Sequence, residues 1–495
     1  SKSVLSVLVV PLSTLPNSDY ASLTRGYGGN LVLVPNKFSL QNIDPADSKV
    51  REAGGDSKVR NVAAFASAEV GWKSMLYLTV TGRNDWNSRL VNSSEESFFY
   101  PSVGLSGIIS EMVKLPTFFS YLKVRGSYTE VGSPVSRSGM TPGTITTPLI
   151  GGSLKSTDIY PFTDYKAERT KSYEVGLTAR FWNKLSLDLT LYKSNTYNQT
   201  FIGDLPESSG YKAVYLQAGN VENRGIEIAL SYNDNFGGVQ WNSSLVYAKN
   251  INEIKEMVKD YYHPMSPKPI NIPEVSKDKG RVLLKVGGSI NDIYARKVLA
   301  KDNQGFVNVS PSGGIGLETV DPIYLGKTTP DFTMGWNNSF TYKNFGLSFL
   351  LNARFGGVVT SSTQALLDRF GVSKASADAR DAGGVMLPNQ GLYDAKKYYM
   401  LTATGENDLA GYYTYSATNV RLQELTLSYK FDSRWFKNII KDLTLSFVAT
   451  NPWMIYCKAP FDPELTASTG TYGQGNDYFM QPSLKSYGFS VKFKF

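Results

Sequence analysis

The residues whose chemistry could serve catalysis are few. Asp462 and Glu464 flank a proline, and paired carboxylates can carry out acid–base catalysis, but a turn-stabilising role is the favoured interpretation because no nucleophile with a base accompanies them. One cysteine, Cys457, and one histidine, His263, allow neither an internal disulfide nor a histidine-rich metal site. The glycines at 313–316 lack the strand and helix that a phosphate-binding loop needs. We therefore expect no enzyme, no metal and no cofactor.

Aromatic residues in two long connecting segments are better candidates for binding. Aromatic rings stack on sugars and on peptide groups, which makes them useful in a binding surface. The alternative is that the same rings pack within their loops or form part of an interfacial girdle. The predicted ligand-binding residues are Tyr393, Tyr398, Tyr399, Tyr412 and Tyr413 in one segment, and Trp453 and Tyr472 in the other.

The elements that must position these residues alternate between apolar and polar side chains. The clearest is at residues 485–495, where Tyr487, Phe489, Val491 and Phe493 take every second place and small or charged residues lie between. Such a period of two places one kind of side chain on each face of a β-strand. The last such strand therefore has one apolar and one polar face.

The same alternation predicts fourteen strands along the chain. In residues 419–431 the apolar face changes at Glu424, which a β-bulge or a membrane boundary would explain. A short helix is expected in 360–370 from the spacing of its apolar residues. The predicted strands are 1–11, 59–72, 74–85, 98–111, 121–131, 168–181, 184–201, 224–233, 239–250, 331–342, 345–355, 419–431, 441–450 and 485–495.

Composition limits the class of protein. The chain has 495 residues, of which 41% are hydrophobic and 13% aromatic, and no apolar run approaches the roughly 18 residues of a membrane helix. A helical membrane protein is excluded. The net charge of +8 is spread along the chain, which argues against nucleic-acid binding. The apolar run at residues 3–11 resembles a weak signal peptide, but an extended strand is the better interpretation.

Connections between the predicted strands alternate between short and long. Short turns on one rim with long loops on the other are typical of outer-membrane β-barrels, whose short turns face the periplasm. We therefore predict an all-β, transmembrane antiparallel barrel, with a soluble β-rich adhesin as the alternative. The expected extracellular loops lie near residues 12–58, 132–167, 251–329, 357–417 and 453–484.

Several motifs carry a family resemblance. Taken in order, they resemble the SusC/RagA-like branch of the TonB-dependent transporters of Bacteroidota. The motifs are residues 78–90 (LTVTGRNDWNSRL), 99–103 (FYPSV), 122–128 (LKVRGSY), 223–227 (NRGIE), 329–332 (TPDF), 420–429 (VRLQELTLSY) and 462–464 (DPE). Within the first of these we expect a structural role at the strand end for Arg83, Asp85 and Arg89, in preference to ligand contact.

The resemblance implies a 22-stranded barrel with an N-terminal plug and a TonB box. Because this chain shows fourteen strands and nothing like a plug, residues 1–495 are expected to be the C-terminal portion of the barrel. The partners implied are the remaining N-terminal barrel and plug, the TonB complex acting through that part, a SusD-like surface lipoprotein, and outer-membrane lipid.

The function implied is uptake of bulky nutrients, either glycans or peptides, across the outer membrane. A passive porin or a barrel that anchors a binding surface is the alternative. The charged residues predicted to face the lumen either tune what passes or anchor the plug; these are Lys123, Arg125, Arg180 and Arg354.

Overall fold

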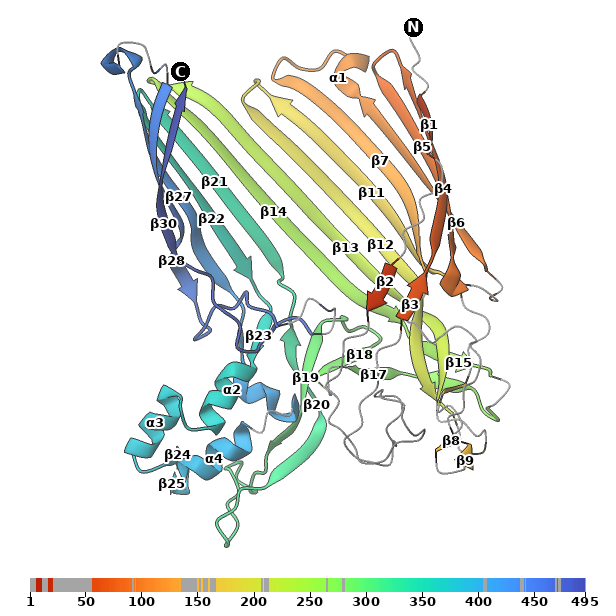
Figure 1. Cartoon of the computed structure of the whole chain (residues 1–495), viewed down its shortest axis with the longest axis vertical. Coiled ribbons are helices and arrows are strands. Elements are labelled where there is room, and N and C mark those ends of the chain that lie inside the picture. Colours follow the sequence, from red (N-terminus) through yellow and green to blue (C-terminus); the bar gives the residue numbers. More distant parts are fainter. Residues whose placement is uncertain are drawn as a thin grey trace, which may run out of the picture.

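One large antiparallel sheet makes up most of the computed structural model (Figure 1). Fourteen strands follow one another across it in chain order, and β10 (Ile159–Tyr160) adds a short parallel pairing to β13. The structure describes residues 6–10, 17–20, 56–90, 93, 95–134, 149–150, 153–154, 159–160, 166–205, 208, 213–263, 266–277, 281–403, 407–436, 440, 442–467, 470 and 473–494.

The fourteen strands are the fourteen expected from the alternation. In order they are β1 (Ser6–Val10), β4 (Asn61–Trp72), β5 (Leu76–Asn87), β6 (Ser97–Ile108), β7 (Phe119–Ser133), β11 (Glu168–Phe181), β12 (Leu185–Asp204), β13 (Ala213–Phe236), β14 (Val239–Glu256), β21 (Phe332–Tyr342), β22 (Phe345–Phe355), β27 (Asn419–Phe431), β28 (Asp442–Cys457) and β30 (Ser486–Lys494). They tilt across a curved wall, with β1 and β30 at its two edges (Figure 1).

Apolar side chains cover one face of this wall and remain exposed. Val80 is paired with Val103, and Leu191 with Ile226, so that apolar residues adjoin across neighbouring strands. Val175 is 59% exposed and Phe489 is 77% exposed. No second sheet is packed on these rows in the described part of the chain. A continuous exposed apolar face of this extent is stable against lipid, and it is the lipid face of a membrane wall.

The indole N–H groups of two tryptophans on the lipid face are partnered. Trp241 Nε1 donates to Asn338 Oδ1 at 3.1 Å, and Trp336 Nε1 donates to Ser243 Oγ at 3.0 Å. The strand register places all four residues on the lipid face. Donors that face hydrocarbon must be satisfied by the protein, because no water is there to accept their hydrogen bonds. Asn338 and Ser243 therefore accept the hydrogen bonds of the two indole N–H groups.

Short turns join the strands at one end of the wall, as predicted. The β4–β5 and β11–β12 turns each contain two consecutive residues with φ between 50° and 56°, Lys73 with Ser74 and Trp182 with Asn183. Gly237 and Gly238, at φ 60° and 79°, complete the β13–β14 turn. Two consecutive positive φ angles match the twist of antiparallel strands and favour tight hairpins.

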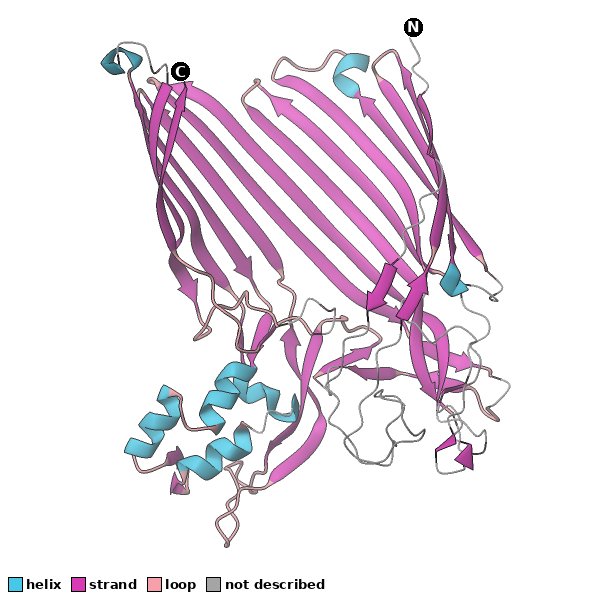
Figure 2. Ribbon diagram, viewed as in Figure 1, coloured by secondary structure: helices cyan, strands magenta, loops and turns pink. Residues whose placement is uncertain are grey.

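The opposite end carries more structure than the sequence predicted (Figure 2). Residues 251–329, which were predicted as one of the extracellular loops, contain a four-stranded sheet and a further hairpin that the sequence did not predict. The sheet is β17 (Glu274–Lys277), β18 (Val282–Lys285), β19 (Asp292–Leu299) and β20 (Leu317–Lys327), and the hairpin pairs β15 (Val258–Tyr261) with β16 (Ile270–Ile272).

The expected loop 357–417 contains a helical lobe (Figure 1). The helix predicted in 360–370 is present as α2 (Ser362–Arg369), which begins where Ser361 Oγ accepts from Gln364 N. Two further α-helices and three strand pairings were not predicted. They are α3 (Lys374–Asp381), α4 (Ala395–Thr402), the hairpin of β24 (Val385–Leu387) with β25 (Gly391–Tyr393), and β23 (Val358–Ser361), which pairs with β26 (Thr414–Ser416) and β29 (Asn476–Asp477).

Strand lengths also differ from expectation on this side. β13 begins at Ala213, eleven residues before the predicted start at 224, and β28 runs to Cys457 instead of ending at 450. The predicted loop at 453–484 therefore begins later. Of the predicted loop 12–58, the described residues include β2 (Asn17–Tyr20) paired with β3 (Asp56–Val59), and within 132–167 they include β8 (Leu149–Ile150) paired with β9 (Ser153–Leu154).

The change of face at Glu424 is caused by a bulge. Leu350 pairs with Glu424 and Leu351 with Leu422, which leaves Gln423 as an extra residue on β27. The bulge allows Leu422 and Leu425 to lie on the same face although an odd number of steps separates them. This confirms the first of the two explanations offered for that switch.

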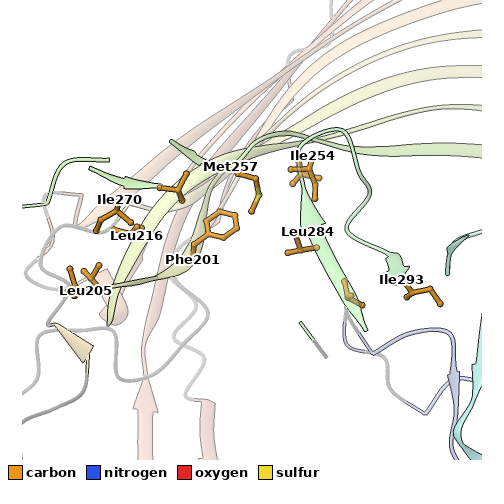
Figure 3. Close-up of a cluster of buried hydrophobic side chains, with 12 residues drawn as sticks. Phe201, Leu205, Leu216, Ile254, Met257, Ile270, Leu284 and Ile293 are labelled. Carbon is orange, nitrogen blue, oxygen red and sulfur yellow. The ribbon is translucent and has the colours of Figure 1, made fainter. Parts of the chain in front are cut away.

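The main buried core lies at the loop end, where β12, β13 and β14 extend beyond the lipid face (Figure 3). Phe201, Leu216 and Ile254 belong to it, together with Leu284 and Ile293 from the four-stranded sheet. Ile254 also exchanges backbone hydrogen bonds with Gly287 and Gly288. The core and these bonds fix the loop-end sheet to the wall. Within the described ranges, no helix is both long and apolar enough to cross a bilayer.

Candidate functional site

The inner face of the wall carries a charged network centred on Arg125. Its guanidinium donates to both carboxylate oxygens of Asp188, at 3.0 and 3.1 Å, and also to Thr178 and Thr190. The side chain lies over Gly176, where an added Cβ would be 2.5 Å from Arg125 Cζ. A bidentate pair of this kind is geometrically restrained. Arg125 is therefore held against the wall, from β7 across to β12.

Uncharged polar groups continue the inner face toward the loop end. Tyr192 OH donates to Asn250 Oδ1 at 3.2 Å, and Asn250 and Asn252 both donate to Asn223 Oδ1. Tyr192 lies over Gly225, where a Cβ would be 2.5 Å from the ring. Gly225 is the central residue of the NRGIE motif, and the close approach of Tyr192 explains why a glycine is required there. The inner face therefore carries amide and hydroxyl groups near the loop end.

Most of the predicted aromatic residues gather in the helical lobe. Tyr398 and Tyr399 lie on α4, with ring centroids 5.4 Å apart, and Tyr412 is 41% exposed. Tyr413 is buried, and its hydroxyl donates to Asp368 Oδ2 at 3.1 Å, which makes it a packing residue of the lobe. Tyr393 lies at the end of β25 and donates to Gly313 O at 2.9 Å.

Trp453 lies apart from the tyrosines, and Tyr472 lies outside the described residues. Trp453 is 60% exposed and lines a cavity of about 270 Å³ at the loop end of β27 and β28. Arg421 and Asp462 line the same cavity. The structure thus divides the predicted residues between two places. Ligand contact stays a prediction for the whole set.

Arg421 and Asp462 form a buried ion pair that fixes the last long loop. Their side chains are 6% and 8% exposed, and Arg421 Nη2 lies 2.8 Å from Asp462 Oδ1. Asp462 also accepts from the backbone N–H groups of Glu464 and Ser483, and Glu464 Oε2 lies 3.4 Å from Arg421. These contacts are those of the predicted turn-stabilising role. What the sequence did not show is that Arg421, on β27, is the partner.

The electrostatics of the pair follow from its contacts. Burial of Asp462 opposes ionisation, but hydrogen bonds from Ser483 and Arg421 outweigh that effect and lower the pKa of the carboxyl below 3.8. Elsewhere in the loop-end sheet, burial raises the pKa of Asp292. Burial, with the nearby Asp292 carboxylate, also raises the pKa of Tyr324 to about 12. No cluster that could hold a metal ion occurs among the residues the structure describes.

A second cavity has a volume of about 1010 Å³ and was not anticipated from the sequence. It lies where β12, β13 and β14 extend past the lipid face, beside the β15–β16 hairpin. Tyr197, Tyr261, Asn198 and Asn271 line it, together with both signs of charge. β13 and β14 continue beyond the ends predicted from the sequence, and this continuation builds the walls of the cavity.

The Arg83, Asp85 and Arg89 motif lies at the loop end of β5. Arg83 Nε is 2.9 Å from Asp85 Oδ1, and Asp85, which is 4% exposed, also accepts a hydrogen bond from Tyr100. These contacts join β5 to β6 and agree with a structural role at the strand end.

The single histidine of the chain, His263, packs its ring edge-on against Tyr160, with the ring centroids 4.8 Å apart, and burial lowers the pKa of His263.

The tilted antiparallel wall has an apolar face toward lipid and a polar inner face. Short turns join its strands at one end, and folded lobes lie at the other. These features define an outer-membrane β-barrel protein. The family model described as "TonB dependent receptor-like, beta-barrel" matches residues 12–451. The chain belongs to this family, and its location is the outer membrane.

Similar proteins support the assignment. The TonB-dependent receptor P3 of Formosa agariphila is 22% identical over 98% of this chain, and the TonB-dependent receptor SusC of Bacteroides thetaiotaomicron is 24% identical over 85% of it. The alignments cover 50% and 43% of those two proteins. The chain thus spans about half the length of the curated relatives it matches.

The fold has a similar solved structure. The RagAB peptide importer in its open-open state matches with a TM-score of 0.68 and 16% identity, over 99% of this chain and 54% of that one. At that identity the likeness concerns the fold alone. The wall described above therefore has a RagA-like fold.

Proposed function

We propose that this chain is the C-terminal barrel portion of a TonB-dependent importer that takes up bulky nutrients through the outer membrane. The observation that carries the proposal is the family match over residues 12–451, on a wall whose strands are joined by short turns at one end and by folded lobes at the other. In this family's membrane orientation the loop end is extracellular, with the predicted loops near 12–58, 132–167, 251–329, 357–417 and 453–484.

The inner face supports passage of a polar solute. Tyr192, Asn223, Asn250 and Asn252 present hydroxyl and amide groups near the loop end, and Arg125 is neutralised by Asp188. Such a surface exchanges hydrogen bonds with the hydroxyl groups of glycans or with the amide groups of peptides. Both substrate classes remain in the proposal. The similar structure is that of a peptide importer, but the similarity concerns the fold and does not choose between the two substrate classes.

The partners proposed are those that the resemblance implies. A SusD-like lipoprotein covers the loop end, where the helical lobe and the four-stranded sheet form a broad surface. The remaining barrel strands and the plug complete the wall, and TonB acts through that part. No role as an enzyme is proposed, and the similar proteins carry the names of receptors and importers.

Conductance distinguishes this function from the alternative. The intact protein, purified from the outer membrane and inserted in planar bilayers, is expected to be almost silent, because a plugged transporter has no open path for ions. A steady open channel would support the passive porin instead and overturn the proposal.

Energy dependence is the second measurement. Uptake of labelled oligosaccharides and oligopeptides by cells that express the protein is expected to stop when a protonophore collapses the inner-membrane gradient. Uptake that continues unchanged, at a rate proportional to external concentration, would indicate passive diffusion. A barrel that only anchors a binding surface would give neither conductance nor uptake.

A further inference from the structure

The apolar rows of the lipid face end abruptly in charged residues at the loop side. On β12, Leu185, Leu187, Leu189 and Leu191 are followed at the next position of the same face by Lys193. The neighbouring strands repeat this pattern, and the register joins the charges across the wall. These residues are Glu130 on β7, Lys171 on β11, Lys193 on β12, Arg224 on β13 and Lys249 on β14. They mark the outer edge of the hydrocarbon layer.

Two cations in this row lie directly opposite each other. Lys193 and Arg224 are cross-strand partners, an arrangement that destabilises a sheet unless anions compensate. Glu222, which is 4% exposed, lies 2.8 Å from Lys193 Nζ. The ion pairs of Arg224 are longer, since its nearest carboxylate oxygens among the described residues, on Glu222 and Glu253, lie 3.9 Å from its guanidinium nitrogens. The exposed guanidinium of Arg224 therefore retains donors for a further anion.

The large cavity continues this cationic row. Lys255, which lies 2.7 Å from Glu253 and 3.8 Å from Glu222, also lines the cavity of about 1010 Å³. Tyr197 lines it too, and the register places Tyr197 on the same face as Lys193. Lys259 and Lys285 add positive charge, while Glu256 and Glu274 line the cavity as well. Its volume lies at the upper end of the range for sites that hold small molecules.

We propose that Lys193, Arg224, Lys249 and Lys255, which we call the cationic patch, bind the phosphorylated head group of an outer-leaflet glycolipid. The acyl chains lie along the apolar row below, against Leu191 and Ile226. The phosphate accepts hydrogen bonds from the fork of Arg224 and the ammonium of Lys193, and the sugar of the head group extends toward the cavity. Basic pockets at a membrane surface recognise lipid phosphates in this way, and arginine is suited to them by its planar geometry.

Charge and position both favour a lipid over a soluble ligand. The patch lies on the lipid face, away from the polar inner surface along which a transported solute moves. Within the cluster, four cations face the two carboxylates Glu222 and Glu253, which leaves positive charge for a phosphate. The inference does not depend on the proposed transport, because it concerns the outer surface of the barrel.

Native mass spectrometry of the intact protein in detergent tests the proposal. The probes are bisphosphorylated lipid A, the same lipid after enzymatic removal of its phosphates, and inorganic phosphate. The expected result is that bisphosphorylated lipid A binds and the dephosphorylated form does not. Equal binding of the two lipids would overturn the proposal, and so would inorganic phosphate that competes with the lipid at equal concentration, because the site would then recognise a free ion.

Substitutions of opposite sign separate binding from folding. The double variant Lys193→Gln/Arg224→Gln is expected to bind lipid A about thirty-fold more weakly, from the usual contribution of two surface cations. Glu222→Gln removes a competing carboxylate and is expected to tighten binding about fivefold. General damage to the wall would weaken binding in both variants, and that outcome would contradict the proposal.

The matched control is Lys492→Gln on β30. Lys492 is an exposed cation, but it lies on the opposite face of β30 from Val491 and Phe493, whose side chains belong to the apolar row. Its loss is expected to leave lipid A binding unchanged. An effect as large as that of the double variant would show that binding follows net charge alone, and would overturn the assignment to the cationic patch.

Discussion

Replacement of Arg421 by leucine is expected to release the last loop-side segment, residues 458–485, from the wall. Arg421 is the cation that holds Asp462 and Glu464, and it also lies 3.4 Å from Ser483 Oγ. Leucine fills part of the space of the arginine side chain but removes the counterion of Asp462. The Asp462 side chain is only 8% exposed. The two backbone bonds to Asp462 are then too few to offset its burial.

The magnitude follows from the burial of the pair. Removal of one partner of a buried ion pair costs about 3–5 kcal/mol, because the other charge remains desolvated. Since about 1.4 kcal/mol corresponds to a tenfold change in an equilibrium constant, the opening of this segment is expected to become at least a hundred times more frequent. The fourteen-stranded wall, whose strand pairings do not involve Asp462, should remain folded.

Hydrogen exchange of the intact protein in detergent measures this opening. Amides in 458–467 and 473–485 are expected to exchange at least a hundredfold faster in Arg421→Leu, while those of β12 and β13 keep the wild-type rate. Arg434→Leu is the matched control, because Arg434 pairs with Asp432 at 2.5 Å but is 83% exposed, and screened surface pairs contribute little. That control should leave the exchange pattern unchanged.

The double variant Arg421→Leu/Asp462→Leu provides the refuting comparison. Apolar replacement of both members of a buried ion pair is often close to neutral, so the double variant should recover much of the protection lost by Arg421→Leu. If the single variant exchanged like the wild type, or the double variant were as open as the sum of both single variants, the buried pair would not be what holds the segment.

Two further results are expected. Gly225→Ala should destabilise the barrel by about 1–3 kcal/mol, measured by its heat-modified migration in gels, because the added Cβ would lie 2.4 Å from Lys249 O, whereas Gly104→Ala, with nothing within 4 Å, should be neutral. The docking of this loop-side segment, residues 458–485, should depend on pH, because the pKa of Asp462 is lower when the segment is docked. The contribution of Asp462 to docking is complete above its ordinary pKa of 3.8 and is lost as the pH falls through the lowered pKa. Pepsin cleavage of that segment should therefore rise as the pH falls below 3.8, and Arg421→Leu should remove this step.

The wall was predictable because its physics is local. Most of the fourteen strands show the period of two that lipid on one face and water on the other impose, and the short turns contain residues such as Asn183 and Gly238 at positive φ. The face switch at Glu424 was visible in the same way, since an extra residue in a strand must change the phase of the alternation. These features depend on neighbours in the sequence.

The loop end was less predictable because its contacts are distant in the sequence. Arg421 and Asp462 are 41 residues apart, and Ile254 reaches Gly288 through a sheet whose short strands alternate weakly. The strands β18 and β19 are buried on parts of both faces, so polar and apolar residues do not alternate along them. Among the predicted binding residues, aromatic type alone did not distinguish Tyr413, which packs inside the lobe, from Tyr412, which is exposed.

The order of pairing across the wall has a consequence for the kinetics of its assembly. Hairpins such as β11–β12 and β13–β14 close through two or three residues, so they can form at once from adjacent segments. The contact of β14 with β21 must instead wait until the ends of a segment spanning 249–332 meet, and each doubling of loop length adds about 0.6 kcal/mol of closure entropy. The β17–β20 sheet shortens that search, because its own pairing, and its docking on Ile254, draw Lys327 and the start of β21 back to the wall.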